Sequence, residues 1–213
     1  MNYPKNAPRQ HSLGLRIWHW LDAAIVVGLI TTFFLRNSLV SHSRYLVAQL
    51  NAKGIAVSDS TAKPIIREMV DQLWTWHIYL GYGLTALLLF RAVLFITDKR
   101  NAAVECWHAV CELRERFDFR NVHSAGVKTG YLAFYILQLF MVLSGLSLTF
   151  SESIGITRET RHQINEAHET VMWFFLAFVI AHIIGVVIAE NRDDPGIISA
   201  MIKPAKVKPL SDP

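Results

Sequence analysis

The chain has 213 residues, of which 52% are hydrophobic, and its mean hydropathy is +0.29. This composition is too apolar for an ordinary soluble domain of this length and indicates a membrane protein. The net charge of +4 and the pI near 9.2 do not indicate nucleic-acid binding, because the basic residues are spread over several loops and do not share one helix face. We therefore expect a chain surrounded by membrane lipid, with no nucleic-acid partner.

Four apolar stretches are long enough to cross a bilayer core about 30 Å thick. They cover residues 17–35, 73–96, 131–150 and 168–189. The sequence thus predicts an all-α fold, an integral membrane four-helix bundle that forms a single domain over residues 1–213. Three segments lie before the first span, between the second and third spans and after the fourth span. Together they contain more Lys and Arg than the other two connections together. By the positive-inside rule, both termini are expected in the cytoplasm.

The first span opens on the segment RIWHW, whose arginine and two tryptophans suit the boundary between water and lipid. A cleaved signal peptide is the competing interpretation, since basic residues precede the apolar run. However, the run is longer than the apolar part of a signal peptide, and no small-residue cleavage site follows Leu35. We therefore expect this span to remain in the protein, with His19 at its cytoplasmic end.

Two connections are long. Residues 36–72 are expected to form an external connection, and the second half of it has the composition of a helix that leads into the second span. Residues 97–126 are expected to form a charged internal loop. This loop contains Cys106, His108 and Cys111, which lack the fourth ligand and the spacing of a usual zinc site. Reduced thiols on a cytoplasmic face are the simpler interpretation.

The fourth span carries His168 and His182 with an uncharged apolar stretch between them. At ~1.5 Å per residue the two imidazoles stand ~21 Å apart along one helix. At ~100° per residue they return to within ~40° of the same face. Such residues are costly to keep in a bilayer without partners. Imidazole binds haem iron, and haem also covers the apolar wall around it.

Because successive spans alternate in direction, the histidines of three spans match in depth. His77 and His168 fall at the external end, whereas His19 and His182 fall at the cytoplasmic end. The sequence thus predicts two haem b groups, each clamped by one of these pairs. Two axial imidazoles leave the iron no open position, which suits electron transfer better than oxygen binding. Any one of these histidines could be an ordinary boundary residue, but their pairing by depth favours the haem interpretation.

Two glycines support the same arrangement. Gly81 follows His77 by four residues, and Gly185 follows His182 by three. Residues at these spacings share a helix face, so each glycine is expected to leave room for a flat ring beside its histidine.

Charged residues near the same depths are candidate partners. The arginines considered for haem propionates are Arg16 and Arg91 at the cytoplasmic level and Arg67 and Arg161 at the external level. For Arg91, snorkelling of the side chain to the interface is the alternative. Asp22 and Glu190 lie near the cytoplasmic haem and could pass protons to or from a quinone, or could simply pair with nearby arginines or face headgroups.

Three segments resemble bacterial cytochrome b561 and the nickel-iron hydrogenase-type b cytochromes. They are RIWHW, WHIYLGYGLTALLLFR and HETVMWFFLAFVIAHIIGVVIAENRDDPGIISAMI, and together they cover essentially the whole membrane part. The resemblance implies two b haems whose ligand positions fall on the four histidines already paired by depth. It also implies a multi-pass protein of the bacterial inner membrane. Such proteins exchange electrons between quinone and a periplasmic redox partner, for example a hydrogenase, another respiratory enzyme or a c-type cytochrome.

Two other functions remain in view, so the sequence leaves open whether the chain is an enzyme in its own right. One is a stand-alone membrane oxidoreductase that acts on superoxide or ferric ion at the external haem. The external cations Arg67, Arg158 and Arg161 could attract an anionic substrate. The other is a haem-free transporter, which would leave the four histidines unexplained and has no sign of the broken helices of a transport site.

Overall fold

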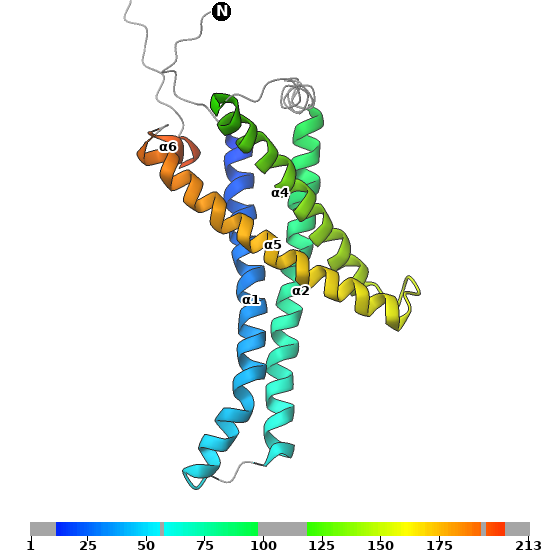
Figure 1. The fold of residues 1–213 in the computed structure, drawn as a ribbon. Coiled ribbons are helices and arrows are strands. Elements are labelled where there is room, and N and C mark those ends of the chain that lie inside the picture. Colours follow the sequence, from blue (N-terminus) through cyan, green and yellow to red (C-terminus); the bar gives the residue numbers. More distant parts are fainter. Residues whose placement is uncertain (1–11, 56–57, 98–118, 193–194, 203–213) are drawn as a thin grey trace, which may run out of the picture.

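The computed structural model describes residues 12–55, 58–97, 119–192 and 195–202. The helices found in them are α1 (Leu13–Ala52), α2 (Asp59–Thr97), α4 (Phe119–Thr149), α5 (Arg158–Asn191) and the short α6 (Ile197–Ile202). All but α6 are long and apolar enough to cross a membrane, which confirms the predicted all-α fold with four spans. Figure 1 shows α1 and α2 running side by side, with α4 and α5 crossing them at an angle.

The ends of the helices follow from local sequence. Ser12 caps α1 by accepting a hydrogen bond from the Leu15 N–H at 3.3 Å, and Thr157 caps α5 in the same way through the Thr160 N–H at 3.2 Å. At the other end of α1, Gly54 takes a φ of +80°, a left-handed conformation that suits glycine and ends the helix.

The expectation of a long connection over residues 36–72 is wrong for its first half, which is largely helical, whereas the helix expected in its second half is confirmed. α1 continues to Ala52 and α2 already begins at Asp59, so most of this segment is helical. The polarity of the sequence rises after the apolar run, but no residue that breaks a helix occurs before Gly54. Figure 1 shows the resulting α1–α2 hairpin extending beyond the turn that joins α4 to α5.

The charged loop expected over residues 97–126 is only partly described, because residues 98–118 lie outside the described ranges. Cys106, His108 and Cys111 fall in this part. α4 begins at Phe119, so the end of the expected loop is helical and the third helix starts earlier than residue 131.

The bundle is built from two helical hairpins. α1 packs along α2 and α4 packs along α5, whereas contact between the hairpins is sparser. One buried apolar residue from each helix forms the shared core, namely Val26, Leu84, Val142 and Phe175. Many large apolar side chains are exposed on the outer faces, as expected for surfaces that meet lipid.

One buried polar contact joins the hairpins. The Gln138 side chain on α4 donates from Nε2 to Asp22 Oδ1 on α1 at 2.6 Å, and the two residues are 0% and 4% exposed. The amide oxygen of Gln138 is buried and has no hydrogen-bond partner among the described residues. Asp22 is thus fixed to the neighbouring hairpin, and a proton-transfer role for it stays a prediction.

The short helix α6 folds back against the start of α1. The Glu190 carboxylate accepts hydrogen bonds from the backbone N–H groups of Gly196 and Ile198, each at 2.9 Å. At the other end of α6, Arg16 Nη2 donates to the Ile202 carbonyl at 2.9 Å. Trp20 Nε1 donates to the carbonyl of Met201 at 3.2 Å. Glu190 therefore has a structural task in holding this segment, in addition to the proton role predicted for it.

Candidate functional site

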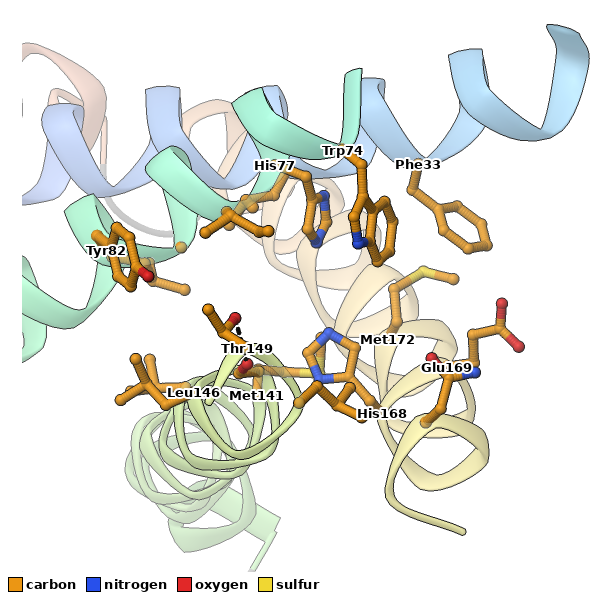
Figure 2. Close-up of a pocket in the computed structure, with 18 of the residues that line it drawn as sticks. Phe33, Trp74, His77, Tyr82, Met141, Leu146, Thr149, His168, Glu169 and Met172 are labelled. Atoms are coloured by element: carbon orange, nitrogen blue, oxygen red, sulfur yellow. Dashed lines mark hydrogen bonds between the residues drawn. The ribbon is translucent and has the colours of Figure 1, made fainter. Parts of the chain in front are cut away.

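A cavity of about 670 Å³ opens between the hairpins and is lined by residues of α1, α2, α4 and α5. Its volume lies within the range of about 300–1,000 Å³ that is typical of cofactor pockets. His77 on α2 and His168 on α5 both line it. Figure 2 shows the two imidazoles facing each other from opposite walls, as their pairing by depth predicts.

A hydroxyl group on a neighbouring helix contacts the Nδ1 atom of each of these imidazoles. Thr32 Oγ1 on α1 lies 2.9 Å from Nδ1 of His77, and Ser144 Oγ on α4 lies 2.7 Å from Nδ1 of His168. The Trp74 ring is also stacked on His77, with centroids 5.0 Å apart and planes 3° from parallel. The rings are thus oriented by two hydroxyl groups and by Trp74, which itself lines the cavity, and the two hydroxyl contacts do not engage the Nε2 atoms.

Three arginines and one carboxylate, that of Glu169, are among the residues that line the cavity, so its charged groups are mostly cationic. Arg36, Arg158 and Arg161 are among its lining residues, and the Arg36 guanidinium lies over the Trp74 ring at 5.3 Å. Arg161 was predicted at this site from the sequence. Arg67 was predicted there too, but it is not among the lining residues; its exposed side chain lies 4.0 Å from Asp71. Arginine forks bind carboxylates well, so the rim suits a ligand with acidic groups.

Glycine leaves open space on the wall of the cavity. A Cβ atom added at Gly81 would meet no atom within 4 Å, and Gly81 lines the cavity beside His77. A Cβ at Gly145 would lie 3.5 Å from Cε1 of His168, an ordinary van der Waals contact, so this glycine packs against the ring. Gly81 leaves open space beside His77, as a broad flat ligand there would need.

The other predicted pair also comes together. The rings of His19 on α1 and His182 on α5 have centroids 6.3 Å apart at an angle of 67°. With metal–imidazole bonds of ~2.0 Å, two rings that ligate one metal from opposite sides have centroids ~6 Å apart. Gly185, on the next turn of α5, also has open space at its Cβ position. The two pairs are ~21 Å apart along α5.

Two arginines were predicted beside His19 and His182, namely Arg16 and Arg91. Arg16 Nε is buried and has no hydrogen-bond partner among the described residues, so this donor is available to an acidic ligand. Arg91 Nε donates to the Tyr135 hydroxyl at 2.9 Å, and its guanidinium lies over the rings of Trp18 and Tyr135. Arg91 thus lies beside Trp18, the neighbour of His19 in sequence, instead of extending away from the bundle.

The ligand set fits haem better than a bare ion. Within the described ranges, no group of three or more His, Cys, Asp or Glu side chains is placed to hold a metal ion. A metal held by two imidazoles alone has to bring its remaining ligands, as iron does in haem. The cavity volume, the open glycine wall and the arginine rim fit the macrocycle and its propionates.

Two kinds of residue were missed from the sequence. The place of Arg36 at this site could have been predicted from its depth in the membrane. It lies ~25 Å from His19 along the helix axis, which brings it to about the level of His77. The contacts of the Thr32 and Ser144 hydroxyl groups with histidine could not be predicted from the sequence, because they depend on how neighbouring helices pack.

Comparison with known proteins gives one family. The model of the family described as prokaryotic cytochrome b561 matches residues 10–204, which is nearly the whole chain and includes the four histidines. Searches of curated proteins and of solved structures find no significant match.

Proposed function

The chain belongs to the prokaryotic cytochrome b561 family, and from this premise we propose that it binds two b haems and carries electrons between quinone and a periplasmic redox partner. Membership of the family makes the chain a membrane electron-transfer protein with b-type haem. One observation supports two haems most directly. Two pairs of histidines face each other at two levels of the same bundle, His77 with His168 and His19 with His182.

The chain's own residues have distinct tasks in this proposal. Haem supplies reversible one-electron chemistry when it is bound, and the protein sets its position, ligation and surroundings. The paired histidines ligate the iron, the glycines leave room for the ring, and the apolar walls exclude water. Arg36, Arg158 and Arg161 neutralise acidic groups at one site, and Arg16 and Arg91 do so at the other.

The distribution of Lys and Arg supports an orientation with both termini in the cytoplasm of a bacterium, in the inner membrane. In this orientation the His77–His168 cavity faces the periplasm. The α1–α2 hairpin then extends past the cavity on the same side, where a redox protein or an enzyme subunit such as a hydrogenase would approach.

The rim arginines give a test that compares two residues of the same type. Arg36→Gln is expected to weaken haem retention at the His77–His168 site, because a cation that lines the cavity is lost. Arg67→Gln is the matched control and is expected to behave like the native protein, since Arg67 is exposed and pairs with Asp71. The rate at which each variant loses haem to a haem-binding protein added in its haem-free form measures the difference. Equal rates for both variants would contradict the assignment of Arg36.

Quinol provides the functional test. The purified chain in liposomes is expected to show reduced b-type haem when a quinol is the only reductant, and to pass these electrons to a soluble acceptor on the other side. Reduction by dithionite but not by any quinol would reject the quinone link while leaving the haem intact.

A stand-alone oxidoreductase is the second candidate, and the rim of Arg36, Arg158 and Arg161 favours it because these cations would attract a small anion such as superoxide. This function predicts turnover of superoxide, or of ferric ion, by the isolated chain with quinone present. The electron-carrier function predicts that turnover requires a partner protein. Steady-state assays of the isolated chain with each substrate distinguish the two.

A further inference from the structure

The two histidines of the cavity share an unusual setting. Each Nδ1 atom faces a hydroxyl group from the partner helix of its own hairpin, Thr32 on α1 for His77 and Ser144 on α4 for His168. The oxygen–nitrogen distances are 2.9 and 2.7 Å, within the range of good hydrogen bonds. Two independent hairpins thus repeat the same contact on opposite walls of one cavity.

Each hydroxyl group also lies within hydrogen-bond distance of a backbone carbonyl oxygen, which can only accept its proton. Thr32 Oγ1 donates to the Leu29 carbonyl at 2.8 Å, and Ser144 Oγ donates to the Phe140 carbonyl at 2.6 Å. Such bonds to the preceding turn are common for Thr and Ser in helices. A hydroxyl group has one proton, so toward the imidazole the oxygen can only accept.

The direction of these bonds determines the histidine tautomer. A neutral imidazole carries one N–H and one bare nitrogen. If Nδ1 donates to the hydroxyl oxygen, then Nε2 is the bare nitrogen, and in both rings Nε2 is the atom left for the cavity. The chain of bonds from imidazole to hydroxyl to carbonyl therefore prepares each ring as a ligand before any metal is present.

We propose that Thr32 and Ser144 are positioning residues that set the tautomer and orientation of His77 and His168 as axial ligands. This inference rests on the proposed function, because it takes the group between the two rings to be haem iron. An Nδ1–H that donates a hydrogen bond makes imidazole a stronger electron donor to the metal. A stronger donor stabilises ferric over ferrous iron, so the hydroxyl groups lower the reduction potential of this haem.

The same helices offer matched controls. Thr31 Oγ1 donates to the Val27 carbonyl at 2.7 Å and Ser147 Oγ to the Leu143 carbonyl at 2.8 Å. Thr31 is exposed and Ser147 is half-buried, and they form the same kind of bond to the preceding turn as Thr32 and Ser144 but do not line the cavity. The informative variants are Thr32→Val and Ser144→Ala, with Thr31→Val and Ser147→Ala as controls and Thr32→Ser as a conservative replacement that restores the hydroxyl.

Redox titration and electron paramagnetic resonance of the full-length protein test the proposal. In Thr32→Val and in Ser144→Ala, we expect one haem to shift to higher potential and to change its low-spin ferric signal, while the other haem is unchanged. Haem affinity at the altered site is expected to fall about 10- to 100-fold, the usual effect of losing a partner of a metal-bound histidine. Thr32→Ser and both controls are expected to retain the native potentials and signals.

The outcomes distinguish the positioning role of Thr32 and Ser144 from the proposed function. Native potentials and signals in both Thr32→Val and Ser144→Ala, with both haems bound, would overturn the positioning role and leave the proposed function standing. A native protein without a pair of low-spin b haems would overturn the proposed function itself. Because the two variants lie on different hairpins, misfolding of one leaves the other as a valid test.

Discussion

His168→Ala is expected to lower the haem content of the purified protein from about two per chain to about one, because the proposed haem site would lose one of its two imidazoles. His182→Ala is expected to do the same by emptying the other site. Since both residues lie on α5, the two variants distinguish the sites within one helix. A pyridine haemochrome assay measures the total haem content. In reduced-minus-oxidised spectra of the native fold, each single variant should lose a different spectral component, and the double variant should lose both.

His42→Ala is the matched control for these variants. His42 lies on α1 but is exposed, bonds to the Ser38 carbonyl at 3.0 Å and does not line the cavity. It is expected to leave the haem content unchanged. Native haem content in either His168→Ala or His182→Ala would show that the pairing of histidines by depth is not what holds the cofactor.

Gln138→Leu is expected to lower the free energy of unfolding by about 1–3 kcal/mol, the usual cost of leaving a buried polar group without its partner. The group affected is Asp22, which is buried between the hairpins and receives its hydrogen bond from Gln138. Thermal unfolding in detergent, followed by circular dichroism, measures the change.

A double-mutant cycle gives the control for this pair. The double variant Asp22→Leu/Gln138→Leu leaves neither polar group buried. Its loss in free energy of unfolding should therefore be clearly smaller than the sum of the losses in the two single variants. Strict additivity of the two single effects would mean that the Asp22–Gln138 contact does not couple α1 to α4.

The features predicted correctly from the sequence are those that depend on one helix at a time. A bilayer demands apolar runs of a certain length, so the four spanning helices were evident from hydropathy. The rise per residue places His182 relative to His168 on α5, and alternating span directions then match His19 and His77 to them in depth. The structure brings both pairs together, although their role as ligands stays a prediction.

The features that were missed depend on contacts between helices or on helices that leave the lipid. Hydropathy falls after Leu35, so the end of the apolar run predicts the end of the helix. A helix outside the membrane does not need a continuous apolar run, and α1 continues to Ala52. The contacts of Thr32 and Ser144 with histidine arise only when the hairpins pack. α6 exists because Glu190 and Arg16 hold its two ends, which no local pattern indicates.

The proposed function requires that one chain holds two haems, each between two histidines. The most direct measurement is the haem-to-protein ratio of the purified native chain, combined with a reduced-minus-oxidised spectrum and a redox titration. We predict about two haems per chain, a low-spin b-type spectrum and two separate midpoint potentials. A single haem with one potential, or a high-spin spectrum with an open iron position, would contradict the account.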